Sequence, residues 1–208
     1  MALKVKYPKK TFMLRGNHET RQMTQLMNFY MEAKEKYDQD VYFDIMDAFD
    51  ALPLATVVNE NYFCVHGGIT KEGEHVDELQ KLNRFDEVPL GGSLCDLVWS
   101  DPVQEEDGSV PNNEPYIGNY QRNCSIFFGA EHCRKFLKKH KYMTVIRAHE
   151  VQIEGYKQHR WPKWQGIPMV YTVFSAPNYC GQYGNKGAIL TIKVPLPNPE
   201  LQLQYQTV

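Results

Sequence analysis

Three histidines, each at the exit of a short apolar segment, constrain the fold of this chain more than any other feature. Each segment has the composition of a strand: residues 11–14 before His18, residues 62–65 before His66 and residues 143–148 before His149. A sheet can bring strand ends from distant parts of a sequence to one edge, and imidazole is the commonest metal ligand and a proton carrier near neutral pH. Any one of these histidines alone is more typical of a structural role, but three at equivalent positions favour a site.

The remaining pattern predicts alternating helices and strands in one domain of 208 residues. Apolar spacing predicts the last turns of a helix over residues 1–8 and further helices over residues 20–37, 41–52, 77–84 and 129–140. Further strands are predicted over residues 54–58, 169–174, 188–194 and 201–205, with a hairpin turn at residues 59–61 and an exposed loop over residues 101–116. The expected class is α/β or α+β, with a largely antiparallel sheet in the second half.

Composition narrows the classes of partner. A formal net charge of -2 gives no basic excess to suggest nucleic acid, and no apolar run approaches the ~20 residues of a membrane span. The N-terminus lacks a secretory signal pattern, so a cytoplasmic or nuclear location is expected. The five cysteines are odd in number and form no CxxC pair, which favours reduced thiols over disulfides or a zinc-thiolate site.

Three more residues are candidates for chemistry. Asn17, next to His18 on a turn with glycine, offers a hard and neutral oxygen suited to Mn, Fe or Zn, although Asn on such a turn more often serves backbone geometry. Arg122 has the planar fork that clamps phosphate, but a surface arginine is equally compatible with the sequence. Tyr179 could donate to a phosphoryl oxygen or simply pack.

Six motifs in order carry a resemblance that covers nearly the whole chain. They are LRGNHE (14–19), MDAFDALPLA (46–55), VHGG (65–68), WSDP (99–102), RAHE (147–150) and FSAPNY (174–179). With this order and spacing, the chain resembles the serine/threonine protein phosphatases of the phosphoprotein phosphatase family. The motif at 46–55, KLNRF at 81–85 and RAHEVQ at 147–152 are most similar to the calcineurin catalytic subunits.

The resemblance implies a metallophosphoesterase-type β-sandwich flanked by helices, with two divalent or trivalent metal ions (Mn, Fe or Zn). It implies that Asn17, His66 and His149 bind one metal, that His18 protonates the leaving group, and that Arg122 holds the phosphate. The implied activity is hydrolysis of phosphoserine and phosphothreonine in proteins by a hydroxide that the metal pair supplies. Phosphoprotein substrates and regulatory or scaffold subunits are the implied partners.

The chain departs from the family pattern at its start. Two family motifs, Gly-Asp-x-His-Gly and Gly-Asp-x-Val-Asp-Arg-Gly, precede LRGNHE in the family and are absent here, and they carry the ligands of the other metal and the bridging carboxylate. Residues 1–208 are therefore expected to be one incomplete catalytic domain that is inactive alone. The alternative is a catalytically silent scaffold or binding module. Asn123 also stands where the family usually has glycine.

Overall fold

The computed structural model describes residues 1–73, 76–193 and 201–206, the last of these by backbone only. The helices are α1 (Ala2–Lys6), α2 (Arg21–Leu26), α3 (Phe29–Lys36), α4 (Gln39–Asp50), α5 (Val76–Leu79), α6 (Ser93–Trp99) and α7 (Ala130–His140). The strands are β1 (Ala55–Val58), β2 (Tyr62–Val65), β3 (Asp101–Pro102), β4 (Tyr116–Gly118), β5 (Ile126–Phe128), β6 (Thr144–Arg147), β7 (Tyr156–Gln158), β8 (Val170–Val173), β9 (Gly187–Ile192) and β10 (Leu201–Gln206).

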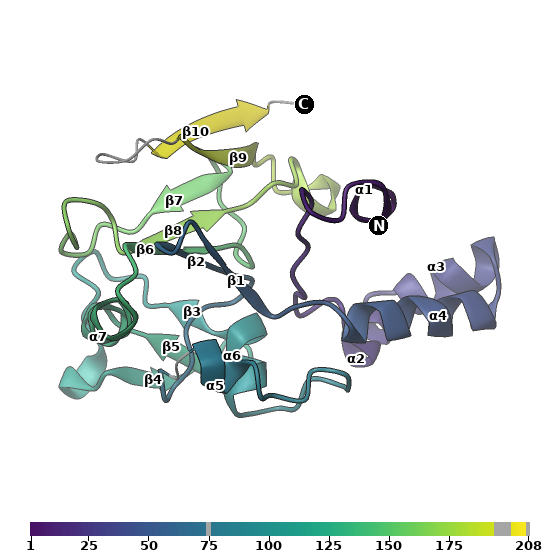
Figure 1. Ribbon diagram of the computed structural model, residues 1–208, viewed down its shortest axis with the longest axis horizontal. Helices are drawn as coiled ribbons and strands as arrows, with labels where there is room; N and C mark the ends of the chain where they lie inside the picture. Colours follow the sequence, from purple (N-terminus) through teal and green to yellow (C-terminus); the bar gives the residue numbers. More distant parts are fainter. Residues whose placement is uncertain (74–75, 194–200, 207–208) are drawn as a thin grey trace.

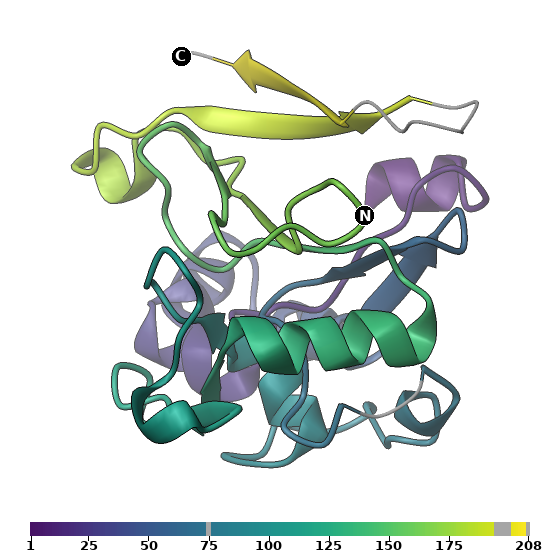
Figure 2. The ribbon, with the colours of Figure 1, turned by 90° about the vertical axis from the view of Figure 1, so that its left-hand side faces the viewer.

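Three sheets form the body of the molecule (Figure 1). A five-stranded sheet with the order β1-β2-β6-β8-β7 lies in the middle, the pair β10-β9 lies on one side of it, and the three-stranded sheet β3-β5-β4 lies on the other. Helix α7 runs across one face of this body (Figure 2). The arrangement of sheets flanked by helices confirms the predicted class.

The expectation of a largely antiparallel sheet was wrong at the centre. Strand β6 pairs in parallel with both β2 and β8, and β3 pairs in parallel with β5. Only the outer pairings, β1 with β2, β7 with β8, β4 with β5 and β9 with β10, are antiparallel among the strands that the structure describes. Parallel neighbours need long crossover connections, and the segment between β2 and β6, which contains α5, α6 and α7, supplies one.

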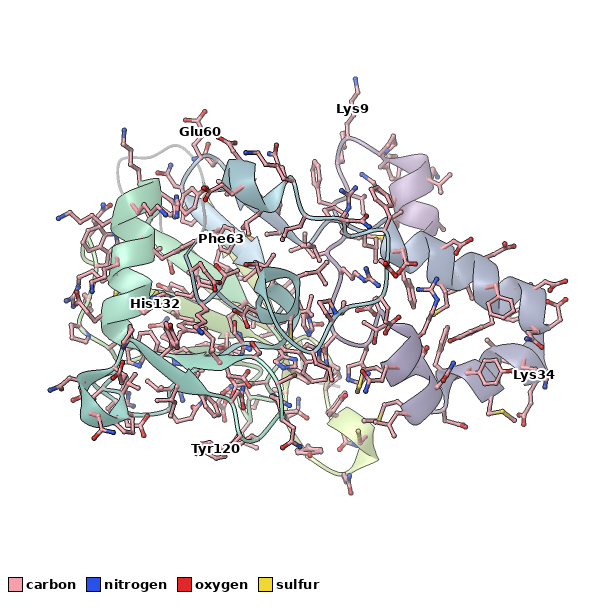
Figure 3. All side chains as sticks on the ribbon, turned by 90° about the horizontal axis from the view of Figure 1, so that it is seen from below. Lys9, Lys34, Glu60, Phe63, Tyr120 and His132 are labelled. Carbon is pink, nitrogen blue, oxygen red and sulfur yellow. The ribbon has the colours of Figure 1, made fainter. Side chains whose placement is uncertain are left out.

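One large apolar core lies between the five-stranded sheet, α6 and α7. Phe63 of β2 is fully buried and its ring packs against those of Phe136 and Tyr142, with centroids 5.0 and 5.8 Å apart. Figure 3 shows Phe63 inside the body and Lys34 far from it, at the outer end of α3. The core therefore fixes the strand ends of the sheet, while α3 contributes nothing to it.

The helices α2, α3 and α4 form an arm beside the sheets (Figure 1). The single helix predicted over residues 20–37 is two helices, because Asn28 adopts a left-handed backbone with φ 68°. The predicted helix over residues 41–52 is confirmed as α4, and its most buried apolar side chains are Tyr42 and Met46. The arm has its own small core, centred on Ala33, Tyr42 and Met46.

Three other expectations needed correction. Residues 11–14 are not a strand but an irregular segment in which Phe12 is 69% exposed. The helix predicted over residues 77–84 is only the single turn of α5, followed by turns. The loop predicted as exposed over residues 101–116 begins with a buried strand, β3, where Asp101 pairs with the buried Arg147 and the partly exposed Arg122.

The remaining predicted elements are confirmed. The hairpin of β1 and β2 turns at Asn59 and Glu60, both with positive φ, and α7 occupies the helix predicted over residues 129–140. The strands β6, β8, β9 and β10 match the predicted ones, except that residue 194, the predicted end of β9, lies outside the described residues.

Candidate metal centre

The parallel pairing of β2 and β6 brings two of the three histidines together. The register that pairs Cys64 with Ile146 continues past the strand ends, where the Ala148 amide donates to the His66 carbonyl at 3.1 Å. As a result His66 Nε2 lies 3.2 Å from His149 Nδ1, although the residues are 83 positions apart. The ordering of the strands therefore creates the pair.

Asn17 completes a group of three side chains. Its Oδ1 lies 2.8 Å from His66 Nε2, and the residue is 2% exposed. Two ligands at right angles around an ion, each bonded at about 2.0–2.3 Å, stand about 2.8–3.3 Å apart. The two measured separations fall in this range, so His66 is spaced from each of its two neighbours as two ligands of one ion would be.

The electrostatic state of the histidines also fits a metal. Burial, together with the positive charge of Arg147, lowers the pKa of His66 to about 3 and also lowers the pKa of His149. Both rings are therefore neutral at physiological pH, the form in which imidazole binds metal. His149 has a left-handed backbone with φ 64°, a strained conformation that turns its ring toward His66.

Two glycines of the motifs are required by close approach around His66. A Cβ added at Gly16 would lie 2.8 Å from His66 Nδ1, and one at Gly67 would lie 2.6 Å from the backbone of Val98 and Trp99. Both distances are shorter than normal carbon contacts allow. The glycines of LRGNHE and VHGG thus let two turns and α6 close around one imidazole.

Arg15 holds the turn that carries Asn17 and His18. Its guanidinium is fully buried, bonds Asp50 Oδ1 at 2.6 Å and donates to three backbone carbonyls, those of Glu19, Arg84 and Asp86. The Gly16 amide donates to Glu19 Oε2 within the turn. Since all these contacts converge on residues 15–19, the turn has one fixed path.

Asp101 had no role assigned from the sequence beyond its place in a motif, although the structure places it beside the group. Asp101 is fully buried, and its carboxylate bonds Arg122 Nε at 2.9 Å and Arg147 at 2.8 Å. His149 Nε2 lies 3.9 Å from Asp101 Oδ1. Arg122, the candidate phosphate clamp, is thus fixed next to a candidate ligand. Asp101 stands in the WSDP motif, but only its burial between cations shows its importance.

The other candidates differ in placement. His18 is exposed and directly follows Asn17 in the turn, and a positive charge on it would lower the pKa of both His66 and His149. Tyr179 lies on a separate loop with its ring against Phe174 and Tyr183, at centroid distances of 5.2 and 5.9 Å. These contacts agree with the packing role left open for Tyr179.

The group of three contains no carboxylate. Within residues 1–73, 76–193 and 201–206, no three or more His, Cys, Asp or Glu side chains cluster as a metal site. The group therefore offers an ion neutral donors only, and the described residues hold no carboxylate cluster that could bridge two ions.

Comparison with known proteins decides the family. The model of the family described as calcineurin-like phosphoesterase matches residues 1–152, about three quarters of the chain. The chain belongs to the calcineurin-like phosphoesterases. The match spans the turn at residues 15–19, the candidate ligands and Asp101, so the observed geometry lies within the part of the chain that defines the family.

Among curated relatives, this chain is similar to two proteins of Saccharomyces cerevisiae. It is 43% identical over 185 residues to the serine/threonine-protein phosphatase 2B catalytic subunit A1, and 36% identical over 212 residues to subunit A2. These alignments cover 86% and 91% of the chain but only 34% and 35% of the two relatives. The chain thus spans about a third of their length.

A solved structure agrees with the fold. It is the structure of a protein serine/threonine phosphatase from Saccharomyces cerevisiae with similarity to human phosphatase PP5, with a TM-score of 0.84 and 28% identity. The match covers all of this chain and 64% of the solved chain. No helix among the described residues is long and apolar enough to span a membrane.

Proposed function

We propose that this chain contributes to metal-dependent hydrolysis of phosphoserine and phosphothreonine in proteins. The observation that carries the proposal is the convergence of Asn17 Oδ1, His66 Nε2 and His149 Nδ1, with Arg122 fixed beside them. Family membership and the similarity to serine/threonine phosphatases support it. Phosphoproteins are then the substrates, and regulatory or scaffold subunits are the expected partners.

The residues of this chain have separate roles in the proposed reaction. Asn17, His66 and His149 hold one ion of a two-metal centre, of Mn, Fe or Zn, which when bound polarises the phosphoryl group and activates water. Arg122 holds the phosphate through the guanidinium edge that Asp101 does not occupy. His18, exposed beside the ligands, donates a proton to the departing serine or threonine oxygen. Tyr179 has the weakest case, because its described contacts are aromatic packing.

We further propose that residues 1–208 alone bind a metal weakly and hydrolyse phosphoprotein poorly. Three neutral donors leave the charge of the ion uncompensated, and the described residues offer no carboxylate cluster to bridge two ions. The same donor set is compatible with a silent scaffold or binding module, so the experiment must separate the two functions.

The test compares residues 1–208 with a chimera in which the matching upstream segment of the yeast phosphatase 2B catalytic subunit A1 precedes them. Both are assayed on a phosphoserine peptide in excess Mn²⁺. The chimera should release phosphate, His66→Ala should abolish the release, and His18→Asn should lower kcat much more than it raises KM.

The His66→Ala chimera also serves as the control for contaminating phosphatases. A folded chimera that binds Mn²⁺ but releases no phosphate above this control would favour the scaffold. Activity of residues 1–208 equal to that of the chimera would refute the proposed dependence on upstream ligands.

A further inference from the structure

Asp101 is a buried carboxylate that four side chains surround. Its Oδ2 accepts from Arg122 Nε and from Asn119 Nδ2, both at 2.9 Å. Its Oδ1 accepts from Arg147 at 2.8 Å and lies 3.9 Å from His149 Nε2. The side chain is 1% exposed. A carboxylate is costly to bury, and both oxygens of this one are committed to cations and amides.

Arg147 connects Asp101 to the strand ends that carry the ligands. It donates through Nε to the Gly67 carbonyl at 2.5 Å, directly after His66. It also bonds Glu150, directly after His149, at 2.6 Å. The pair of Asp101 and Arg147 therefore joins β3 to the exits of β2 and β6.

Asn119 connects Asp101 to the turn that carries Arg122. The Asn119 side chain donates to Asp101, while its oxygen accepts from the backbone amides of Gln121 and Arg122 at 3.2 Å each. Asn123 and Ser125 adopt left-handed backbones with φ 57° and 63°. Because the turn and the guanidinium of Arg122 are both held by one carboxylate, Arg122 has a defined direction although its side chain is 29% exposed.

We propose that Asp101 is a positioning residue that aims Arg122 at a phosphate on the metal centre, and this rests on the proposed function. The carboxylate binds the Nε edge of the guanidinium, so the terminal amino groups remain for the ligand. Without this contact the long side chain of Arg122 would have to lose its rotational freedom each time a phosphate binds.

The proposal differs from a purely structural role for Asp101. A structural role predicts that replacement weakens the fold and lowers phosphate and metal binding together. Positioning predicts a selective loss of phosphate binding that passes through Arg122, so removing Arg122 should cancel the effect of removing Asp101.

The experiment measures binding of inorganic phosphate to residues 1–208 by calorimetry, in Mn²⁺ kept below the precipitation limit. Asp101→Asn keeps the shape of the side chain and removes its charge. It should weaken phosphate binding about tenfold or more, as Arg122→Ala should, because a charge-assisted contact is lost. The double variant should bind no more than about twofold more weakly than Arg122→Ala alone.

Two matched variants complete the design. Glu131→Gln removes a carboxylate that pairs with Arg134 on α7, outside the group, and it should leave phosphate affinity within about twofold of that of the unmodified chain. Arg122→Lys, at a partly exposed position, keeps the charge but not the fork. It should bind phosphate as poorly as Arg122→Ala, since one ammonium cannot serve both Asp101 and the ligand.

Phosphate affinity of Asp101→Asn within twofold of the unmodified chain, or losses from Asp101→Asn and Arg122→Ala that simply add, would overturn the proposal. If Asp101→Asn does not fold, Arg122→Lys becomes the deciding variant. Phosphate affinity of Arg122→Lys equal to that of the unmodified chain would then overturn the positioning role of Asp101.

If the unmodified chain binds no phosphate, which its weak metal binding allows, the chimera still tests the proposed function, and the positioning is tested separately. The Nε–H of Arg122 should give a slowly exchanging NMR signal in the unmodified chain, and Asp101→Asn should lose it. A signal that the substitution leaves unchanged rejects positioning.

Discussion

Two buried arginines, Arg15 and Arg147, hold the two sides of the candidate centre in different ways. Both guanidinium groups are fully buried. Arg15 bonds one carboxylate, Asp50, and three backbone carbonyls. Arg147 bonds two carboxylates, Asp101 and Glu150, and two carbonyls. The first mainly holds backbone, whereas the second mainly organises charges.

The partners of the two arginines show why this matters. Asp50 also bonds Arg21, a partly exposed residue at the start of α2, so Asp50 connects Arg15 to the helical arm. Asp101 also bonds Arg122, so Asp101 connects Arg147 to the candidate phosphate clamp. Burial lowers the pKa of Arg15 despite Asp50 and Glu87. Similar arginine–aspartate pairs can thus serve the path of the chain or the direction of a functional side chain.

Replacing either arginine by methionine should have the largest effect on stability. Arg15→Met removes one of the two arginine partners of Asp50 and the donor of three carbonyls, and Arg147→Met removes a buried donor from each of two carboxylates. Breaking a buried pair from one side costs about 3–5 kcal/mol of unfolding free energy. Urea denaturation would measure both losses, and a loss below about 1 kcal/mol for either variant would contradict the buried-anchor role.

Hydrogen exchange would sharpen the comparison between these variants. Arg15→Met should increase exchange at residues 15–19 and 84–87, and Arg147→Met at residues 66–68 and 99–102. The same map for both variants would mean that the two anchors belong to one cooperative unit.

Acid should act first on the Arg147 side. His159, beside β7, bonds Thr172 at 3.0 Å, and burial, with the charges of Lys157 and Arg147, lowers its pKa from 6.5 to about 3. The unfolded chain takes up the proton near pH 6.5 and the folded chain does not, so this contribution is complete above pH 6.5 and is lost as pH falls toward 3. From His159 alone, the unfolding free energy should fall by about 3 kcal/mol between about pH 7 and 4.

Denaturant titrations at a series of pH values would measure this slope. His159→Gln serves as the comparison: glutamine cannot be protonated, so the unfolding free energy of this variant should depend less steeply on pH. A slope that is unchanged in His159→Gln would assign the acid sensitivity to other groups.

The smallest effect is expected at Asn123, in the turn that Asp101 organises. Its φ of 57° suits glycine or asparagine, so Asn123→Gly should change unfolding free energy by less than about 0.5 kcal/mol. Asn123→Val should cost about 1–2 kcal/mol, because a β-branched side chain opposes this conformation. Thermal unfolding of the two variants would measure the difference, and equal stability would show that the turn can relax.

Local patterns predicted elements well where the cause was local. The hairpin of β1 and β2, helix α7 and strands β6 and β8 follow from runs of apolar residues and turn residues. Residues 11–14 have the composition of a strand but form none, because a strand also needs a partner strand and a single segment does not specify its pairing. The parallel pairing of β6 was missed for the same reason.

The residues of the candidate site also differ in whether the sequence alone could predict them. Asn17, His66 and His149 could be predicted because each is an unusual residue at a strand exit or in a turn, and the structure brings their donor atoms together. Asp101 could not, because its place in a polar segment resembles that of a surface loop residue. Its role depends on Arg122 and Arg147, which only tertiary structure places around it.

The parallel pairing of β2 with β6 also sets when the centre can form during folding. His66 and His149 are 83 residues apart in the chain, so they meet only after a large loop has closed. Contacts of such long range form slowly and late. An early folding intermediate should therefore have little affinity for metal, and a metal ion that binds the native centre would act mainly by slowing unfolding.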